Sequence, residues 1–320
     1  MTRPTLLDIA KRNLGDNEVG LIEEAIYNLP EITGFDREYN RAIAGVGQIK
    51  PIKGINYYTK VRTALPTAGF RAANEGVTAT KSSYINRLVE TFILNPRWEC
   101  DKAVADRDEM GPEAFIAEEA DGVLQAAFLQ AARNFYYGVN TTYSGDAKGY
   151  PGLIDSYDST NMVVDAGGTT VTTGSSVWLV KWGPKDVRWV VGQNGELVIS
   201  DVRVETILDA SSAPLTGYVQ ELLGYLGLQV GSINSVCRIK KLTADSGTGL
   251  TDTLLYQALG KFPAGVRPDS IFLTKRSREQ LRNDRTAVNT TGAPAPIPTE
   301  FEGIPILTTS ALSDVEALTL

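Results

Sequence analysis

Four carboxylates lie close together before the middle of the chain, and carboxylate oxygens are the ligands that Ca²⁺ and Mg²⁺ prefer. They are Asp101, Asp106, Asp108 and Glu109. Their spacing matches no metal-binding loop of known geometry, so ordinary solvated carboxylates are the favoured interpretation. The chain also contains no histidine. Because histidine is the commonest general base and the commonest metal ligand, we expect no catalytic residue, no metal and no cofactor, and a protein that is not an enzyme.

The other residues that could take part in chemistry form no recognisable site. Cys100 and Cys237 are too isolated for a disulfide framework or a zinc site, and small buried side chains are the favoured interpretation. Residues 45–47 (GVG) and 247–249 (GTG) are only fragments of phosphate-binding loops. A hydrolase that uses paired carboxylates therefore stays a remote alternative, because it would need two acidic residues with divergent pKa values in one cleft.

Composition favours a globular protein with an acidic surface. The 320 residues are 42% hydrophobic and 22% charged, with a net charge of −7 and a pI of about 4.9. This balance argues against nucleic-acid binding over the whole surface. No stretch approaches the roughly 18 apolar residues of a membrane span, and residues 1–29 have no apolar signal-peptide core. We expect a cytoplasmic setting and no membrane partner.

One long helix organises the sequence, between Gly111 and Gly138. Pro112 suits a first helical position and Gly138 suits the residue just past the end. Apolar residues recur at three- and four-residue steps, which predicts one buried stripe along the helix. The stripe consists of Ile116, Ala120, Val123, Ala127, Ala131 and Phe135.

Charge is sorted into two blocks around this helix. Residues 37–87 hold nine basic and two acidic residues, while residues 99–121 hold nine acidic and two basic ones. Two solvated faces would explain the pattern without any contact between the blocks. The alternative hypothesis is that a basic hairpin lies across the acidic helix start, within one chain or on a neighbouring subunit. The proposed contact residues are Lys60, Arg62, Arg71 and Lys81 on the hairpin and Glu113, Glu118, Glu119 and Asp121 on the helix.

The remaining elements are shorter. We expect helical pieces over 5–13 and 17–28, and a long hairpin around residues 55–65. Runs at 176–182, 187–191 and 196–200 predict a β meander whose three tryptophans pack in the core. Further strands are expected at 236–242, 270–273 and 303–307, with helices at 250–262 and 275–284. From residue 147 onward the pattern is mixed α+β.

An ordered series of short motifs resembles the major capsid proteins of tailed bacteriophages with the Hong Kong 97-like fold. The motifs are RTALP at 62–66, Arg71, NEGV at 74–77, KSS at 81–83, DK at 101–102, AD at 105–106, FYYG at 135–138, GL at 152–153, GG at 167–168, SVWLVKWG at 176–183 and the closing segment at 292–312. The resemblance covers the chain from about residue 5 to its end. It implies an α+β fold with an N-terminal arm, an extended hairpin called the E-loop, a spine helix in a peripheral domain, and an axial domain.

On this resemblance the arm is expected at 1–42, the E-loop at 43–97, the peripheral domain at 98–146, the axial domain at 147–300, and a C-terminal segment returning to the peripheral domain at 301–320. The resemblance also implies that the E-loop lies over a neighbouring subunit. The expected function is a shell of hexamers and pentamers enclosing double-stranded DNA in the virion, assembled in the host cytoplasm.

The expected partners are further copies of the chain, a portal protein, a separate scaffolding protein and the packaged DNA. The DNA contact should be slight and independent of base sequence, because the subunit is acidic. We expect a separate scaffolding protein because the chain starts directly with the arm, and we predict no covalent cross-link. The alternative with the same fold is an encapsulin-like nanocompartment shell, which encloses an enzyme in place of a genome.

Overall fold

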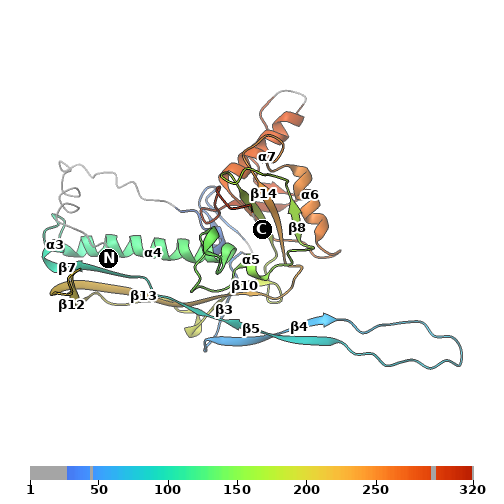
Figure 1. The fold of residues 1–320 in the computed structure, drawn as a ribbon, viewed down its shortest axis with the longest axis horizontal. Helices are drawn as coiled ribbons and strands as arrows, with labels where there is room; N and C mark the ends of the chain where they lie inside the picture. Colours follow the sequence, from blue (N-terminus) through green and yellow to red (C-terminus); the bar gives the residue numbers. More distant parts are fainter. Residues whose placement is uncertain (1–26, 44–45, 290–292, 319–320) are drawn as a thin grey trace.

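The computed structural model describes residues 27–43, 46–289 and 293–318. The subunit is elongated: a long hairpin projects at one end, a long helix runs toward the other, and a smaller sheet with two helices stands beside them (Figure 1). The helix predicted at 5–13, and nearly all of the one predicted at 17–28, lie outside the described residues.

The elements follow a mixed order. They are α2 (Pro30–Thr33), β1 (Phe35–Asp36), β2 (Arg41–Ala42), β3 (Ile49–Pro51), β4 (Asn56–Ala64), β5 (Ser83–Glu90), β6 (Phe92–Leu94), β7 (Arg97–Asp101), α3 (Lys102–Ala105), α4 (Pro112–Tyr137), η1 (Thr141–Tyr143), α5 (Leu153–Ser156), β8 (Val163–Asp165), β9 (Ser175–Val180), β10 (Val187–Val191), η2 (Gln193–Gly195), β11 (Val198–Ile199), β12 (Arg203–Leu208), β13 (Pro214–Val230), β14 (Val236–Leu242), α6 (Asp252–Lys261), β15 (Ser270–Leu273), α7 (Lys275–Val288), β16 (Glu300–Phe301) and β17 (Ile304–Thr308).

The predicted long helix is confirmed as α4, which has 26 residues. Gly111 precedes it with φ +93° and Gly138 ends it with φ +53°, backbone conformations that suit glycine. The first half of α4 is exposed or half-buried except at Phe115, which is buried with Trp98, Cys100 and Ala105. Phe135, Tyr136 and Tyr137 at the end of the helix are fully buried. The helix is therefore anchored in the core at its C-terminal end.

Gly122 inside α4 and Gly138 just past its end give opposite expectations for substitution by alanine. At Gly138, an added Cβ would overlap Asp155 Oδ2 and the Gly152 backbone nitrogen, and φ is positive. We expect Gly138→Ala to lower the free energy of unfolding by more than about 1 kcal/mol. At Gly122, in the helix interior, no atom lies within 4 Å of the added Cβ. Gly122→Ala should stabilise by about 0.5–1 kcal/mol. Thermal unfolding of both variants checks this pair, and a Gly138→Ala protein as stable as wild type would contradict it.

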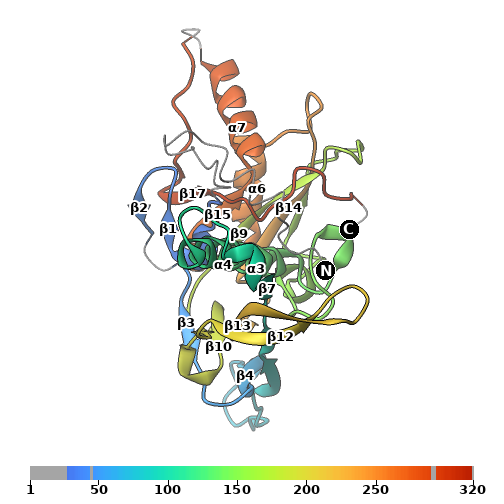
Figure 2. The same ribbon diagram turned by 90° about the vertical axis from the view of Figure 1, so that its left-hand side faces the viewer.

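A sheet of seven strands runs along α4, and its centre is the 17-residue strand β13. One edge of β13 pairs with β12, β11 and β10, and the other pairs with β7 and β6. Figure 2 shows α4 end-on, with β12 and β13 on one side of it and the second sheet on the other. Residues 203–226 therefore lie beside the long helix, although the sequence analysis grouped them with residues 147–300.

The second sheet has six strands in the order β16-β17-β15-β9-β14-β8. Strand β9 is buried on both faces: Val177 and Leu179 join the core that includes residues of α6 and α7, while Trp178 and Val180 join the core at the end of α4. The segment from residue 301 contributes β17 and the end of β16 to this sheet, and its Ser313 and Glu316 are hydrogen-bonded to Tyr137 at the end of α4.

The predicted β meander is wrong, because its strands belong to different sheets. Strand β9 pairs with β14 and β15, whereas β10 pairs with β13 and β3. The turn from Gly183 to Asp186 carries the chain from one sheet to the other. The third run pairs with β13 through Val198 and Ile199 of β11 and through the Ser200 nitrogen, which donates to the Glu221 carbonyl. The long strand β13 supplies the pairing edge for both β10 and β11, which local turn signals do not reveal.

Aromatic side chains join the two sheets to the end of α4. The Phe135 ring stacks on Trp182 at 5.6 Å and on Trp189 at 5.2 Å between ring centroids, and it meets Phe272 edge-on. Trp178, Trp182 and Trp189 are all buried, so the prediction of core roles for them is confirmed. This cluster fixes the body from which the hairpin and the helix start extend.

Candidate inter-subunit contact site

The hairpin of β4 and β5 is anchored at its base and exposed along its length. Tyr57 OH donates a hydrogen bond to Gln229 Oε1, and Arg87 Nη1 donates to the Val230 carbonyl at 2.7 Å. Val89, in β5, is buried against Ile52. Beyond this base, nearly every residue from position 62 to 88 is exposed (Figure 1). The hairpin therefore presents its outer part as a surface for contact.

The basic residues predicted for this surface are exposed on the hairpin. Lys60 Nζ lies 4.9 Å from the centre of the Tyr84 ring, and Arg62 Nη2 donates to Tyr84 OH at 3.0 Å. The hydrogen bond from Arg62 lowers the pKa of the Tyr84 hydroxyl. In the connecting loop, Arg71 Nη1 donates to the Glu75 carbonyl at 2.8 Å, and Lys81 is exposed near the start of β5.

Tyr84 was missed by the sequence analysis. It faces Arg62 directly across the two strands, in an antiparallel register that also pairs Tyr58 with Leu88 and Lys60 with Asn86. Directly opposed residues of an antiparallel pair point to the same face. One face of the hairpin is thus both cationic and aromatic, and the signal that could have found it is the register of the two strands.

The acidic residues predicted as partners lie on the first half of α4. Glu113, Glu118 and Asp121 are exposed and Glu119 is half-buried. Asp121 Oδ2 accepts a hydrogen bond from Gln125 Nε2 at 2.7 Å. Figure 1 places this helix start and the hairpin at opposite ends of the molecule, so the hairpin does not lie across the helix start of its own subunit.

Two of the four carboxylates considered for metal binding accept hydrogen bonds from the local backbone. Asp101 Oδ1 accepts a hydrogen bond from the Ala103 nitrogen and caps α3, and Asp108 Oδ1 accepts from the Met110 nitrogen. Within the described ranges, no three acidic or cysteine side chains are grouped so that they could hold a metal ion. Among the same residues, no helix is long and apolar enough to cross a bilayer.

A comparison with protein families identifies the family of this chain. The family model of major capsid protein GP7 matches residues 38–319, nearly the whole chain. The chain belongs to this family of major capsid proteins. As a member, the capsid protein is a structural component of a phage head, and its place is the virion. The prediction that it is not an enzyme is confirmed by the family, which supports neither the hydrolase nor the nanocompartment alternative.

One solved structure superposes on the capsid protein over nearly its whole length. A chain of bacteriophage Epsilon15 superposes with a TM-score of 0.69 at 21% identity, covering 99% of the capsid protein and 98% of that chain. This likeness confirms the α+β capsid fold expected from the sequence. A chain of Mycobacterium phage Cain matches with a TM-score of 0.49, 12% identity and coverages of 74% and 98%. The capsid of bacteriophage JBD30 matches with a TM-score of 0.46 at 12% identity, covering 87% of the capsid protein and 95% of that chain. No curated protein sequence matches the chain.

A buried ion pair in the capsid protein was not foreseen from the sequence. Arg238, on β14, and Glu316, in the C-terminal segment, are each 2% exposed, and Nη2 lies 3.2 Å from Oε2. Glu316 Oε1 also accepts hydrogen bonds from Tyr137 OH at 2.6 Å and Ser176 Oγ at 2.9 Å. Burial is the largest effect on the pKa of the Arg238 guanidinium and lowers it, but the attraction of Glu316, together with the effects of Tyr157 and Tyr137, outweighs burial, so the pKa is raised.

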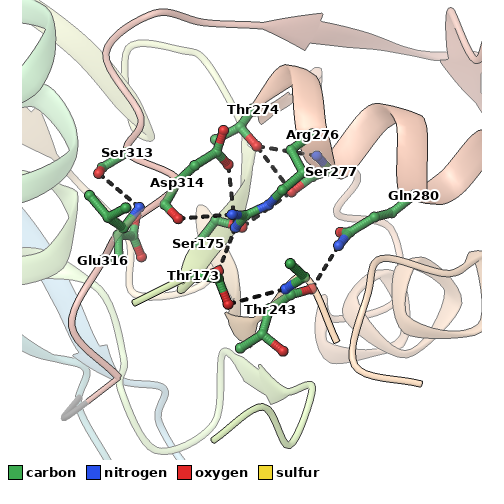
Figure 3. Close-up of polar contacts among 12 residues, drawn as sticks. Thr173, Ser175, Thr243, Thr274, Arg276, Ser277, Gln280, Ser313, Asp314 and Glu316 are labelled. Carbon is green, nitrogen blue, oxygen red and sulfur yellow. Dashed lines mark hydrogen bonds and ion pairs between the residues drawn. The ribbon is translucent and has the colours of Figure 1, made fainter. Parts of the chain in front are cut away.

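A second arginine holds the same C-terminal segment from α7. Figure 3 shows the guanidinium of Arg276 between Asp314 and the Thr173 backbone. Nη1 donates to the Asp314 carbonyl at 2.9 Å, and Nη2 donates to the Thr173 carbonyl at 2.6 Å. The two arginines together fix residues 314–316 against the six-stranded sheet and the end of α4.

Proposed function

We propose that this capsid protein builds an icosahedral shell of hexamers and pentamers around double-stranded DNA, and that the basic hairpin of one copy lies on the acidic start of α4 of its neighbour. The observation that supports the contact is the placement of the basic hairpin and the acidic start of α4 at opposite ends of the subunit. Complementary blocks so placed suit a head-to-tail contact, which forms rings when the rotation between copies closes.

The contact gains from charge without depending on one strong ion pair. An exposed ion pair contributes about 0.2–1 kcal/mol, so a single pair would not hold two subunits together. Lys60 and Arg62 lie on one face with Tyr84, and Glu118 and Glu119 follow one another on α4. Because the same contact repeats at every subunit of a ring, small contributions add up over the shell.

On the resemblance to tailed-phage capsid proteins, we also propose a separate scaffolding protein and a portal protein as partners during assembly. The proposed contact with packaged DNA is weak and independent of base sequence, because a subunit with net charge −7 has few cations to spare for phosphates.

Charge reversal tests the proposed contact. The hairpin variant Lys60→Glu/Arg62→Glu and the helix variant Glu118→Lys/Glu119→Lys should each reduce the yield of shells strongly, because each places like charges together. The variant that combines all four substitutions should restore assembly, as measured by sedimentation and negative-stain microscopy of purified particles.

The control reverses two exposed lysines elsewhere. Lys148→Glu/Lys185→Glu changes the net charge as much as the hairpin variant does, at exposed positions outside the hairpin strands and the first half of α4. It should assemble like wild type. If the combined variant assembles no better than the two it combines, the pairing of hairpin and helix is refuted.

A further inference from the structure

A shallow apolar hollow lies beside the first half of α4, between this helix and the strands β7, β11 and β13. It holds about 280 Å³ of empty space, and the described part of the chain leaves it open to solvent. The apolar side chains that line it are Trp98, Ala120, Val123, Leu124, Ile199 and Leu222. An open apolar hollow on a subunit surface suits an apolar side chain of a partner.

Polar side chains that are already held form one wall of the hollow. Gln220 Oε1 accepts a hydrogen bond from Trp98 Nε1 at 3.2 Å, and Gln220 Nε2 donates to the Ser200 carbonyl at 3.0 Å. Glu221 Oε1 lies 2.7 Å from Arg203 Nη2. Because these side chains have fixed partners, a docking group would not have to order them first, which lowers the cost of binding.

Acidic side chains of α4 lie beside the hollow. Asp121 is exposed and precedes Leu124 by three residues. Glu113 is exposed and precedes Ala120 by seven residues. Both spacings bring two residues to the same side of a helix. A partner that fits this place should therefore carry an apolar group with positive charges next to it.

Tyr84 of the hairpin has this combination. Its side chain is 47% exposed. Lys60 Nζ lies 4.9 Å from the centre of its ring, and Arg62 Nη2 donates to its hydroxyl at 3.0 Å. The hairpin extends away from the hollow of its own chain (Figure 1), so the hollow that Tyr84 can reach is that of another copy. Tyrosine rings that enter a partner's pocket commonly contribute much of the binding free energy of an interface.

We propose that Tyr84 of one copy occupies the hollow beside α4 of a neighbouring copy and is the apolar anchor of the contact between hairpin and helix. The inference rests on the proposed function, because it takes these two surfaces to meet in a shell. Lys60 and Arg62 would then face Glu113 and Asp121 at the edge of the hollow. Charge orients the two surfaces, while burial of the ring contributes the larger share of the binding free energy, because exposed ion pairs contribute little.

Truncation of the ring tests the anchor. Tyr84→Ala should raise the subunit concentration needed for shell assembly by about tenfold or more, because the loss of a buried tyrosine anchor is costly. Tyr84→Phe keeps the ring and removes only the hydroxyl, so it should stay within about threefold of wild type.

Tyr58→Ala is the matched control. Tyr58 is 70% exposed on the same face of the hairpin, four residues from Arg62, or about 13 Å along the strand. This variant should raise the concentration needed for assembly much less than Tyr84→Ala does. Equal losses from the two substitutions would contradict a specific role for Tyr84.

Filling the hollow tests the other side of the contact. Ala120→Phe adds a ring to a half-buried residue that lines the hollow, so the subunit should stay folded while shell yield falls as it does for Tyr84→Ala. Ala126→Phe adds the same ring to an exposed position of α4 outside the hollow, and should assemble like wild type. Thermal unfolding of both unassembled subunits shows whether the fold is kept.

Photo-cross-linking identifies the contact while an aromatic ring stays in place. We expect p-azidophenylalanine in place of Tyr84 to link two copies of the chain when shells are illuminated. Mass spectrometry should find the links in peptides that contain residues 120–124, 198–199 or 220–222. The same group in place of Tyr58 should give other products. A link from position 84 to a different part of the chain, or to a different protein, would overturn the docking of Tyr84 in the hollow.

The outcomes distinguish the anchor from the proposed function. Tyr84→Ala and Ala120→Phe could both assemble like wild type while the charge reversals of hairpin and helix behave as expected. The anchor would then be wrong, and the contact between hairpin and helix would stand. Failure of the wild-type chain to form any shell would count against the proposed function itself.

Discussion

Replacing Glu316 by alanine is expected to destabilise the capsid protein by about 3–5 kcal/mol, the cost of leaving one partner of a buried ion pair without its counter-charge. Arg238 would stay buried, 2% exposed, beside the ring of Trp178. Tyr137 OH and Ser176 Oγ would lose the carboxylate oxygen to which both donate. Urea denaturation of the unassembled subunit at neutral pH measures this loss.

Asp314→Ala is the matched control, because it removes an acidic residue from the same segment. Its carboxylate lies 3.4 Å from Arg276, but both side chains are partly exposed, so the expected loss is about 1 kcal/mol or less. The double variant Arg238→Met/Glu316→Leu tests whether the loss comes from one unpaired buried charge. Because it removes both charges together, it should recover most of the stability that Glu316→Ala loses. A Glu316→Ala protein no less stable than Asp314→Ala would show that the pair does not hold the segment.

Elements that depend on residues close together in the chain could be predicted from the sequence. Pro112 and Gly138 mark the ends of α4, and the apolar repeat between them gave its direction of burial. Strand β4 and the exposed hairpin followed from short β-forming runs between glycine and proline breaks. These features depend on residues a few positions apart, which is the range that propensity and capping describe.

Features that depend on distant residues could not be predicted. Strand β13 pairs with five other strands, and its pairing decided that β9 and β10 lie in different sheets. Glu316 meets Arg238 across 78 residues of sequence, so no spacing pattern marks the pair. The opposite charges of hairpin and helix were readable as blocks, but only the fold shows that they lie at opposite ends of the subunit.

Raising the pH from about 5 to 8 is expected to destabilise the protein through Glu31. This side chain is fully buried, and burial raises the pKa of its carboxyl from 4.5 to about 8. Thr309 Oγ1 donates a hydrogen bond to Oε1 at 2.8 Å. Below pH 4.5 the carboxyl is protonated in both folded and unfolded chains, and its contribution is fully present. Between pH 4.5 and 8 the unfolded chain ionises while the folded chain keeps its proton, so stability falls as pH rises.

The expected size of this loss is several kcal/mol, because each unit of difference in pKa corresponds to about 1.4 kcal/mol. Other carboxyls with a shifted pKa do not change stability between pH 4.5 and 8. Burial has the largest effect on the pKa of Glu38 and raises it, but the hydrogen bonds from Arg278 and Thr308 and the charges of Arg278 and Lys275 together outweigh it, so the pKa is lowered. The pKa values of Asp158 and Asp165 are lowered as well. Their contributions are therefore present above pH 4.5 and are lost only at lower pH.

Glu31→Gln isolates the effect, because the amide oxygen can still accept from Thr309 while the ionisable group is gone. We expect this variant to match wild type near pH 5 and to exceed its free energy of unfolding by several kcal/mol at pH 8. Urea denaturation followed by tryptophan fluorescence suits the measurement, since Trp189 Nε1 donates to the Glu31 carbonyl at 2.8 Å. Glu38→Gln, in the same segment, should keep the wild-type slope between pH 5 and 8. Glu31→Gln could instead show the wild-type decrease in the free energy of unfolding between pH 5 and 8. A group other than Glu31 would then cause the pH dependence, and the segment around residue 31 would not be held by a neutral carboxyl.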